Sequence, residues 1–136
     1  MRNNLKHLSW IPSIYFMQGF PYAIVTLLTL VLYKRLGISN STITLVTSLF
    51  TLPWVIKPFF APLLEILATK KHIIIIAQFC MVALLLALSM MLFSGLFFAS
   101  SVVILMLFAF VSSSNDAAID AVYIAIANEY ARFACI

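Results

Sequence analysis

Hydrophobic residues fall into four long runs that are separated by short polar stretches. The runs cover residues 8–33, 43–67, 73–93 and 97–127. A helix needs about 20 mostly apolar residues to cross the hydrocarbon core of a bilayer, so each run is long enough for one crossing. The pattern predicts an all-α integral membrane chain of four transmembrane helices.

Composition supports a membrane location and narrows the function. Of the 136 residues, 65% are hydrophobic and 9% are charged, whereas about a quarter of a typical soluble domain is charged. Four crossings use roughly 80 residues, which leaves no room for a separate water-soluble catalytic domain. The two cysteines match no disulfide framework or metal site. We therefore expect a chain that is not an enzyme, has no cofactor or metal, binds no nucleic acid and has membrane lipid as its surroundings.

Basic residues at the ends of the runs predict the orientation. One side of the membrane would carry five of them, which are Arg2, Lys6, Lys70, Lys71 and Arg132. The other side would carry Lys34 and Arg35. The excess of positive charge places both termini in the cytoplasm. Aromatic residues at the ends of the first and fourth runs are expected to be interface anchors, namely Trp10, Tyr33 and Tyr130.

Three ionisable residues lie inside the runs, at Lys57, Asp116 and Asp120. A charge at membrane depth costs at least about 2.5 kcal/mol, so these residues need a partner or a water-filled cavity. Prolines surround the lysine at positions 53, 58 and 62. Because each proline removes a backbone donor and strains the preceding turn, we expect a bend beside Lys57.

Asp116 and Asp120 are four residues apart and share one face of the fourth predicted helix. Two neighbouring carboxylates in a medium of low dielectric resist ionising together, which suits one of them to carry a proton. The alternative is structural pairing, either with Lys57 or with polar groups of helices that this chain does not contain. For Lys57 itself, the choice lies between lining a solute or ion path and balancing a carboxylate.

The first run carries a second polar patch. Gln18 and Tyr22 are also four apart, while Gly19 and Pro21 would allow close approach or local unwinding. A helix-packing seam and a solute-binding patch both fit this pattern.

Residues 61–71, between the second and third runs, resemble the loop motif G-x-L-x-D-R-x-G-R-[RK] of the major facilitator superfamily. Glu65 takes the acidic position, and Lys70 the last basic one, followed by Lys71. The motif belongs between the second and third helices in that superfamily. The resemblance thus implies a cytoplasmic loop motif at Glu65, Lys70 and Lys71.

A more specific resemblance covers residues 112–121, with the sequence SSSNDAAIDA. It is similar to S-A-[ST]-Q-D-I-x-x-D-A in the fourth helix of AmpG-type muropeptide permeases and related acetyl-coenzyme A transporters. Residues 18–22 and 53–63 resemble the helix-one and helix-two signatures of the same branch. Asn115 stands where that branch usually has Gln or His.

The resemblance implies a transporter of about twelve helices, built from inverted three-helix repeats. This chain would be an incomplete N-terminal domain, part of a six-helix bundle whose missing C-terminal helices are its partners. The implied function is a proton-linked permease in a bacterial inner membrane for an amphiphilic solute such as an anhydromuropeptide, inactive without the other helices. The candidate solute- or proton-path residues are Gln18, Tyr22, Lys57, Asn115, Asp116 and Asp120.

Two other functional classes fit parts of the sequence. A small four-helix exporter that oligomerises, or a membrane scaffold without transport, would also be autonomous at this length. The exporter would need an acid in its first helix, and the first run has none. A metal-dependent phosphotransferase would use the Asp116-x-x-x-Asp120 spacing, but its motif begins with Asp-Gly, which does not occur here.

Overall fold

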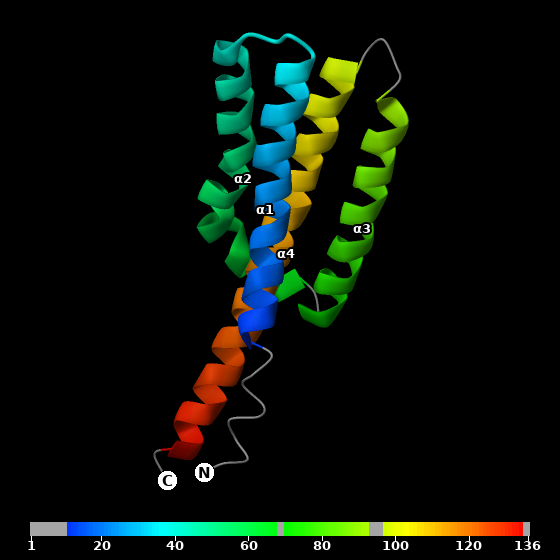
Figure 1. Ribbon diagram of the computed structural model, residues 1–136. Helices are drawn as coiled ribbons and strands as arrows, with labels where there is room; N and C mark the ends of the chain where they lie inside the picture. Colours follow the sequence, from blue (N-terminus) through cyan, green and yellow to red (C-terminus); the bar gives the residue numbers. More distant parts are fainter. Residues whose placement is uncertain (1–10, 68–69, 93–96, 135–136) are drawn as a thin grey trace.

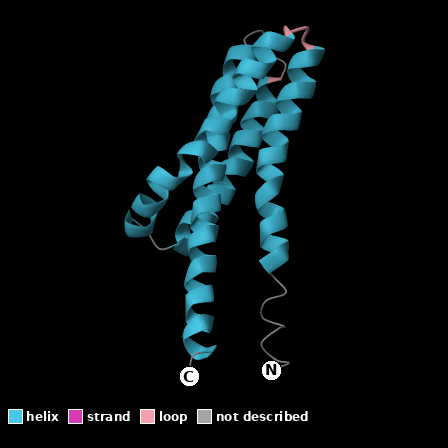
Figure 2. Cartoon of the chain, turned by 90° about the vertical axis from the view of Figure 1, so that its left-hand side faces the viewer, coloured by secondary structure: helices cyan, strands magenta, loops and turns pink. Residues whose placement is uncertain are grey.

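The computed structural model describes residues 11–67, 70–92 and 97–134. Four helices make up this part of the chain: α1 (Ile11–Arg35), α2 (Asn40–Leu67), α3 (Lys70–Met91) and α4 (Phe97–Ala134). Consecutive helices run in opposite directions, so α1 begins and α4 ends at the same end of the bundle (Figure 1). The described residues contain no strand, as Figure 2 also shows. The prediction of an all-α chain of four helices is therefore confirmed.

The helix ends differ from the predicted runs by up to seven residues. The largest difference is in α4, which continues to Ala134 instead of ending at residue 127. Hydropathy marks where apolar side chains stop, but a helix continues as long as its backbone hydrogen bonds do. With 38 residues, α4 is about 57 Å long, longer than the roughly 30 Å hydrocarbon core. Its last turns extend past the other helices in Figure 1.

A tight turn joins α1 to α2. Gly37 has φ +73°, and the N–H groups of Gly37 and Ile38 donate to the carbonyls of Lys34 and Tyr33 at 3.2 and 3.1 Å. This is the Schellman arrangement that ends many helices. Ser39 then caps α2, because its Oγ accepts a hydrogen bond from the backbone N–H of Thr42 at 3.3 Å. The cap explains why α2 begins at Asn40, three residues before the second hydrophobic run.

Three stretches of the described chain are long and apolar enough to cross a membrane. They are Asn40–Phe59 in α2, Lys71–Met91 in α3 and Phe97–Ile126 in α4. At 25 residues, α1 is about 37 Å long and exceeds the thickness of the hydrocarbon core. The crossing by α1 stays a prediction.

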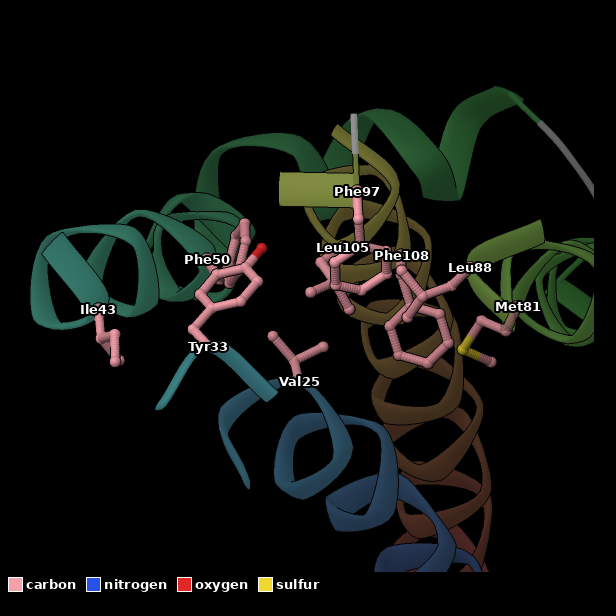
Figure 3. Close-up of a cluster of buried hydrophobic side chains, with 9 residues drawn as sticks. All are labelled: Val25, Tyr33, Ile43, Phe50, Met81, Leu88, Phe97, Leu105 and Phe108. Carbon is pink, nitrogen blue, oxygen red and sulfur yellow. The ribbon is translucent and has the colours of Figure 1, made fainter. Parts of the chain in front are cut away.

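The core lies along α4, which packs against each of the other three helices. Nine buried side chains from the four helices converge there (Figure 3), namely Val25, Tyr33, Ile43, Phe50, Met81, Leu88, Phe97, Leu105 and Phe108. The expectation that Tyr33 is an interface anchor is wrong, because its side chain is fully buried. Its hydroxyl lies 2.8 Å from Oγ of Ser101, and that contact fastens α1 to α4. Trp10 and the side chain of Tyr130 lie outside the described residues.

Candidate functional site

Three prolines lie in the part of α2 that borders the candidate site. Pro53, Pro58 and Pro62 all lie inside α2, which bends in this half of its length (Figure 1). Ser113 of α4 donates a hydrogen bond from Oγ to the backbone carbonyl of Pro53 at 2.8 Å, and both residues are buried. This contact holds the bent part of α2 against α4 and brings Lys57 opposite the two aspartates.

Lys57 and Asp120 form an ion pair between α2 and α4. The distance from Nζ of Lys57 to Oδ2 of Asp120 is 2.5 Å, and the two side chains are 23% and 36% exposed. Lys57 therefore has an internal partner. The partial exposure shows that the pair lies at the edge of the contact between α2 and α4.

Asp116 lies one helical turn away and is bound differently. Its Oδ2 accepts a hydrogen bond from the indole Nε1 of Trp54 at 2.9 Å. The residue is only 5% exposed, and its Oδ1 has no hydrogen-bond partner among the described residues. The ring of Trp54 meets Tyr22 edge to face, with 5.1 Å between centroids. Asp116 is thus a buried carboxylate with one oxygen that has no hydrogen-bond partner among the described residues.

Gln18 connects α1 to both aspartates. Its Nε2 donates to the backbone carbonyl of Asp116 at 3.2 Å and to Oδ1 of Asp120 at 3.3 Å. Both acceptors are oxygens, so only the NH₂ side of the carboxamide can face them. We call Gln18, Trp54, Lys57, Asp116 and Asp120 the polar cluster. Tyr22, four residues after Gln18, lies beside the cluster through its contact with Trp54.

Two hollows flank this cluster, and Asp120 lines both of them. The first, of about 290 Å³, has Lys57 on its wall together with Pro58, Ala61, Pro62, Ala117, Ala121 and Ile124. The second, of about 460 Å³, is lined by Gln18, Gly19, Tyr22, Trp54, Asp116 and Asp120. The Lys57–Asp120 pair lies where the two hollows approach each other.

The charges of the cluster do not cancel. Lys57 supplies one positive charge, and the two aspartates supply two negative charges when both are ionised. The ammonium contacts Asp120, whereas Asp116 receives only the neutral indole N–H. Within the described residues, no three His, Cys, Asp or Glu side chains gather in a way that could hold a metal ion. The arrangement can bind a proton or a hydrogen-bond donor at Asp116.

Not every candidate residue joins the cluster. Asn115 is buried and lines a third hollow, between α1, α3 and α4. Lys71 is exposed in the first turn of α3. The side chains of Glu65 and Lys70 lie outside the described residues, so the loop motif stays a prediction.

The close approach that Gly19 would allow does not occur among the described residues. A Cβ atom added at this position would meet nothing within 4 Å, and α1 continues through Gly19 and Pro21 without unwinding. Gly19 borders the second hollow, so the absence of a side chain there leaves open space among the described residues. The choice between a packing seam and a solute-binding patch stays a prediction.

Trp54 is the site residue that the sequence did not single out. It lies within the signature at residues 53–63 and is three residues before Lys57, so the two side chains share one helix face. The same spacing argument that joined Asp116 to Asp120 would have paired Trp54 with one aspartate and Lys57 with the other.

Comparison with known proteins identifies the family. No match was found among curated protein sequences or among solved structures. Residues 18–135 match the BT1 family, a family of membrane transporters. The match begins at Gln18 and includes all the residues of the polar cluster. The chain therefore belongs to the BT1 family and is an integral membrane protein of transmembrane transport.

Proposed function

We propose that this chain is the N-terminal part of a proton-linked permease and that Asp116 carries the coupled proton. The observation that carries this proposal is the unequal pairing of the two aspartates. Lys57 neutralises Asp120, while Asp116 is buried with a neutral donor on one oxygen and no partner on the other. A buried carboxylate without a counter-ion is the group most stabilised by taking up a proton.

In this proposal the Lys57–Asp120 pair acts as the partner of the proton site. Gln18 links the two aspartates through the carbonyl of Asp116 and the carboxylate of Asp120. Protonation of Asp116 removes the excess negative charge beside this link and leaves Asp120 balanced by Lys57. Asp116 is then the midplane carrier, and Asp120, one turn closer to the cytoplasmic end, is the exit-side relay.

The solute would occupy the hollow beside Asp116. This hollow combines aromatic surface from Tyr22 and Trp54 with the carboxylates of Asp116 and Asp120. Aromatic faces beside acceptor oxygens suit a solute with an apolar surface and hydrogen-bond donors. An amphiphilic solute such as an anhydromuropeptide fits this description, and the resemblance of residues 112–121 to muropeptide permeases supports it.

We further propose that this chain does not accumulate solute alone. Both hollows of the polar cluster are open at the surface of the bundle. Alternating access in such transporters needs two bundles that move about a shared site, and a second bundle would close the hollows. The bacterial inner membrane, with both termini cytoplasmic, is the location that we propose for the assembled permease.

The test is proton-driven uptake of an anhydromuropeptide by the complete transporter in vesicles. Asp116→Asn keeps the shape of the side chain but cannot carry a proton, so accumulation driven by a pH gradient should be lost while the protein remains inserted. Ser114→Ala is the matched control, because the Ser114 hydroxyl donates to the carbonyl of Phe110 in its own helix and Ser114 lines neither hollow of the polar cluster. Normal pH-dependent accumulation by Asp116→Asn would refute the coupling role.

A further inference from the structure

A third hollow, of about 620 Å³, lies between α1 and α3 and has α4 as its floor. We infer that this groove is a separate binding site for an amphiphile that has an apolar chain and a hydroxyl head. Its volume is typical of ligand pockets. The groove shares Gln18 with the hollow beside Asp116 and none of its other lining residues with either hollow of the polar cluster. The inference does not depend on proton-linked transport.

The walls of the groove are mostly apolar. On α3, the lining residues recur every three to four positions, which places them on one stripe that faces α1. They are Ile74, Gln78, Met81, Val82 and Leu85. Phe20, Pro21 and Ile24 line the opposite wall on α1. Such a lining suits an acyl chain.

Two buried acceptors give the groove its polar specificity. Oδ1 of Asn115 and Oε1 of Gln18 are both buried without a hydrogen-bond partner among the described residues, and both residues line the groove. Asn115 is only 5% exposed. The Gln18 carboxamide turns its NH₂ toward the aspartates, so its oxygen remains an acceptor. An occupant that brings hydrogen-bond donors would satisfy both atoms.

The position of the polar groups orients the occupant. Gln18 lies at the level of Asn115, because its amide contacts the backbone of the neighbouring Asp116. From this level, the apolar lining continues toward Leu85 and Phe108, farther along the bundle. On α3, Gln78 and Leu85 are seven positions apart, which corresponds to about 10 Å along the helix. The head would bind at Asn115 and Gln18, with the chain extending toward Leu85.

A pure hydrocarbon chain does not meet these requirements, because it would leave both acceptors buried and without a hydrogen bond. A fatty acid anion also fits poorly, since its carboxylate brings no donor to two acceptor oxygens. A monoacylglycerol has two hydroxyl groups and one chain, so it matches both the acceptors and the apolar walls.

The experiment uses the full chain in phosphatidylcholine vesicles, whose headgroups bring no hydroxyl or N–H donor. The probe is a monoacylglycerol with a diazirine in its acyl chain, and the comparison probe is the methyl ester of the same acid. After illumination, mass spectrometry locates the label. We expect label on the groove residues of α1 and α3, and competition by unlabelled monoacylglycerol at a concentration about tenfold lower than for the ester.

Two variants separate specific binding from contact with bulk lipid. Val82→Trp fills the groove, and Val103→Trp is its control because the two valines are 58% and 59% exposed and only Val82 lines the groove. Labelling should fall in the first variant and persist in the second. Asn115→Leu should remove the preference for the monoacylglycerol over the ester. Any of three results would overturn the inference. The two probes could label the groove equally, or labelling could persist in Val82→Trp. The groove could also carry no label because another helix occupies it.

Discussion

The indole N–H of Trp54 donates to Oδ2 of Asp116 across 2.9 Å and so joins α2 to α4 at a buried carboxylate. A neutral donor stabilises the carboxylate without cancelling its charge. Asp116 therefore differs from Asp120, whose partner is the ammonium of Lys57. The two aspartates have the same chemistry and lie one turn apart, and their partners on α2 give them different electrostatic surroundings.

Replacing Trp54 by Phe should destabilise the protein. The variant keeps an aromatic ring beside Tyr22 but removes the donor to Asp116, which should lower the free energy of unfolding by about 1–3 kcal/mol. Unfolding of the purified protein in detergent by a chemical denaturant measures the change. Tyr22→Phe is the control, because it preserves the ring contact with Trp54. An equal loss of stability in the two variants would show that the hydrogen bond from Trp54 to Asp116 does not account for the effect.

Replacing Lys57 by Met should leave Asp120 without its counter-ion. Removing one member of a fully buried pair costs about 3–5 kcal/mol, and partial exposure reduces this loss to about 1–2 kcal/mol here. The double variant Lys57→Met with Asp120→Leu should recover most of the loss, since no charge is then stranded. A double variant as unstable as the sum of the two single variants would argue against a direct interaction.

The two described glycines should respond in opposite ways to substitution by Ala. Gly37→Ala should cost about 1–2 kcal/mol because of the positive φ of this residue, and Gly37→Asn should cost less because Asn tolerates that conformation. Gly19→Ala lies within α1 with open space around its new Cβ, so it should stabilise the helix by up to about 1 kcal/mol. Thermal unfolding in detergent compares the three variants. A loss of stability in Gly19→Ala would mean that the space is filled.

The predicted orientation can be checked by labelling single cysteines in a variant without Cys80 and Cys135. Ser41 lies in the first turn of α2 and His72 in the first turn of α3, at opposite ends of the bundle, and both are exposed. With both termini cytoplasmic, an impermeant maleimide added from outside should modify Ser41→Cys and spare His72→Cys. Permeabilised cells should show labelling of both. The reverse pattern in intact cells would invert the topology.

The existence of four helices was predictable, because long apolar runs have few other stable forms in a bilayer. The ends of the helices were not, because they depend on backbone hydrogen bonds and caps. Ser39 illustrates this difference: its side chain starts α2 ahead of the apolar run. Tyr33 shows a related limit, since its position at the end of a run resembles that of an interface anchor, while packing against α4 buries it.

Most residues of the candidate site were predictable from the sequence, but the aspartate that pairs with Lys57 was not. Helical spacing placed Asp116 and Asp120 on one face, and the depth of Lys57 demanded a partner. Which aspartate that partner would be depends on how far α2 and α4 are shifted along each other. That shift is set by contacts such as the hydrogen bond from Ser113 to the carbonyl of Pro53, which leaves no periodic pattern in the sequence.

The hydrogen bonds between α1 and α4 limit how α1 can tilt. Tyr33 is joined to Ser101 near one end of α1, and Gln18 is joined to Asp116 and Asp120 near the other. Gln18 and Tyr33 are fifteen positions apart, which corresponds to about 22 Å along α1. Ser101 also donates to the carbonyl of Phe98, so the tyrosine hydroxyl is the donor in a fully buried contact. The hydrogen bonds of Gln18 border open hollows, so they are weaker than the buried hydrogen bond between Tyr33 and Ser101. A tilt of α1 that pivots at Tyr33 would therefore have to break both hydrogen bonds of Gln18 and also separate Tyr22 from Trp54 of α2.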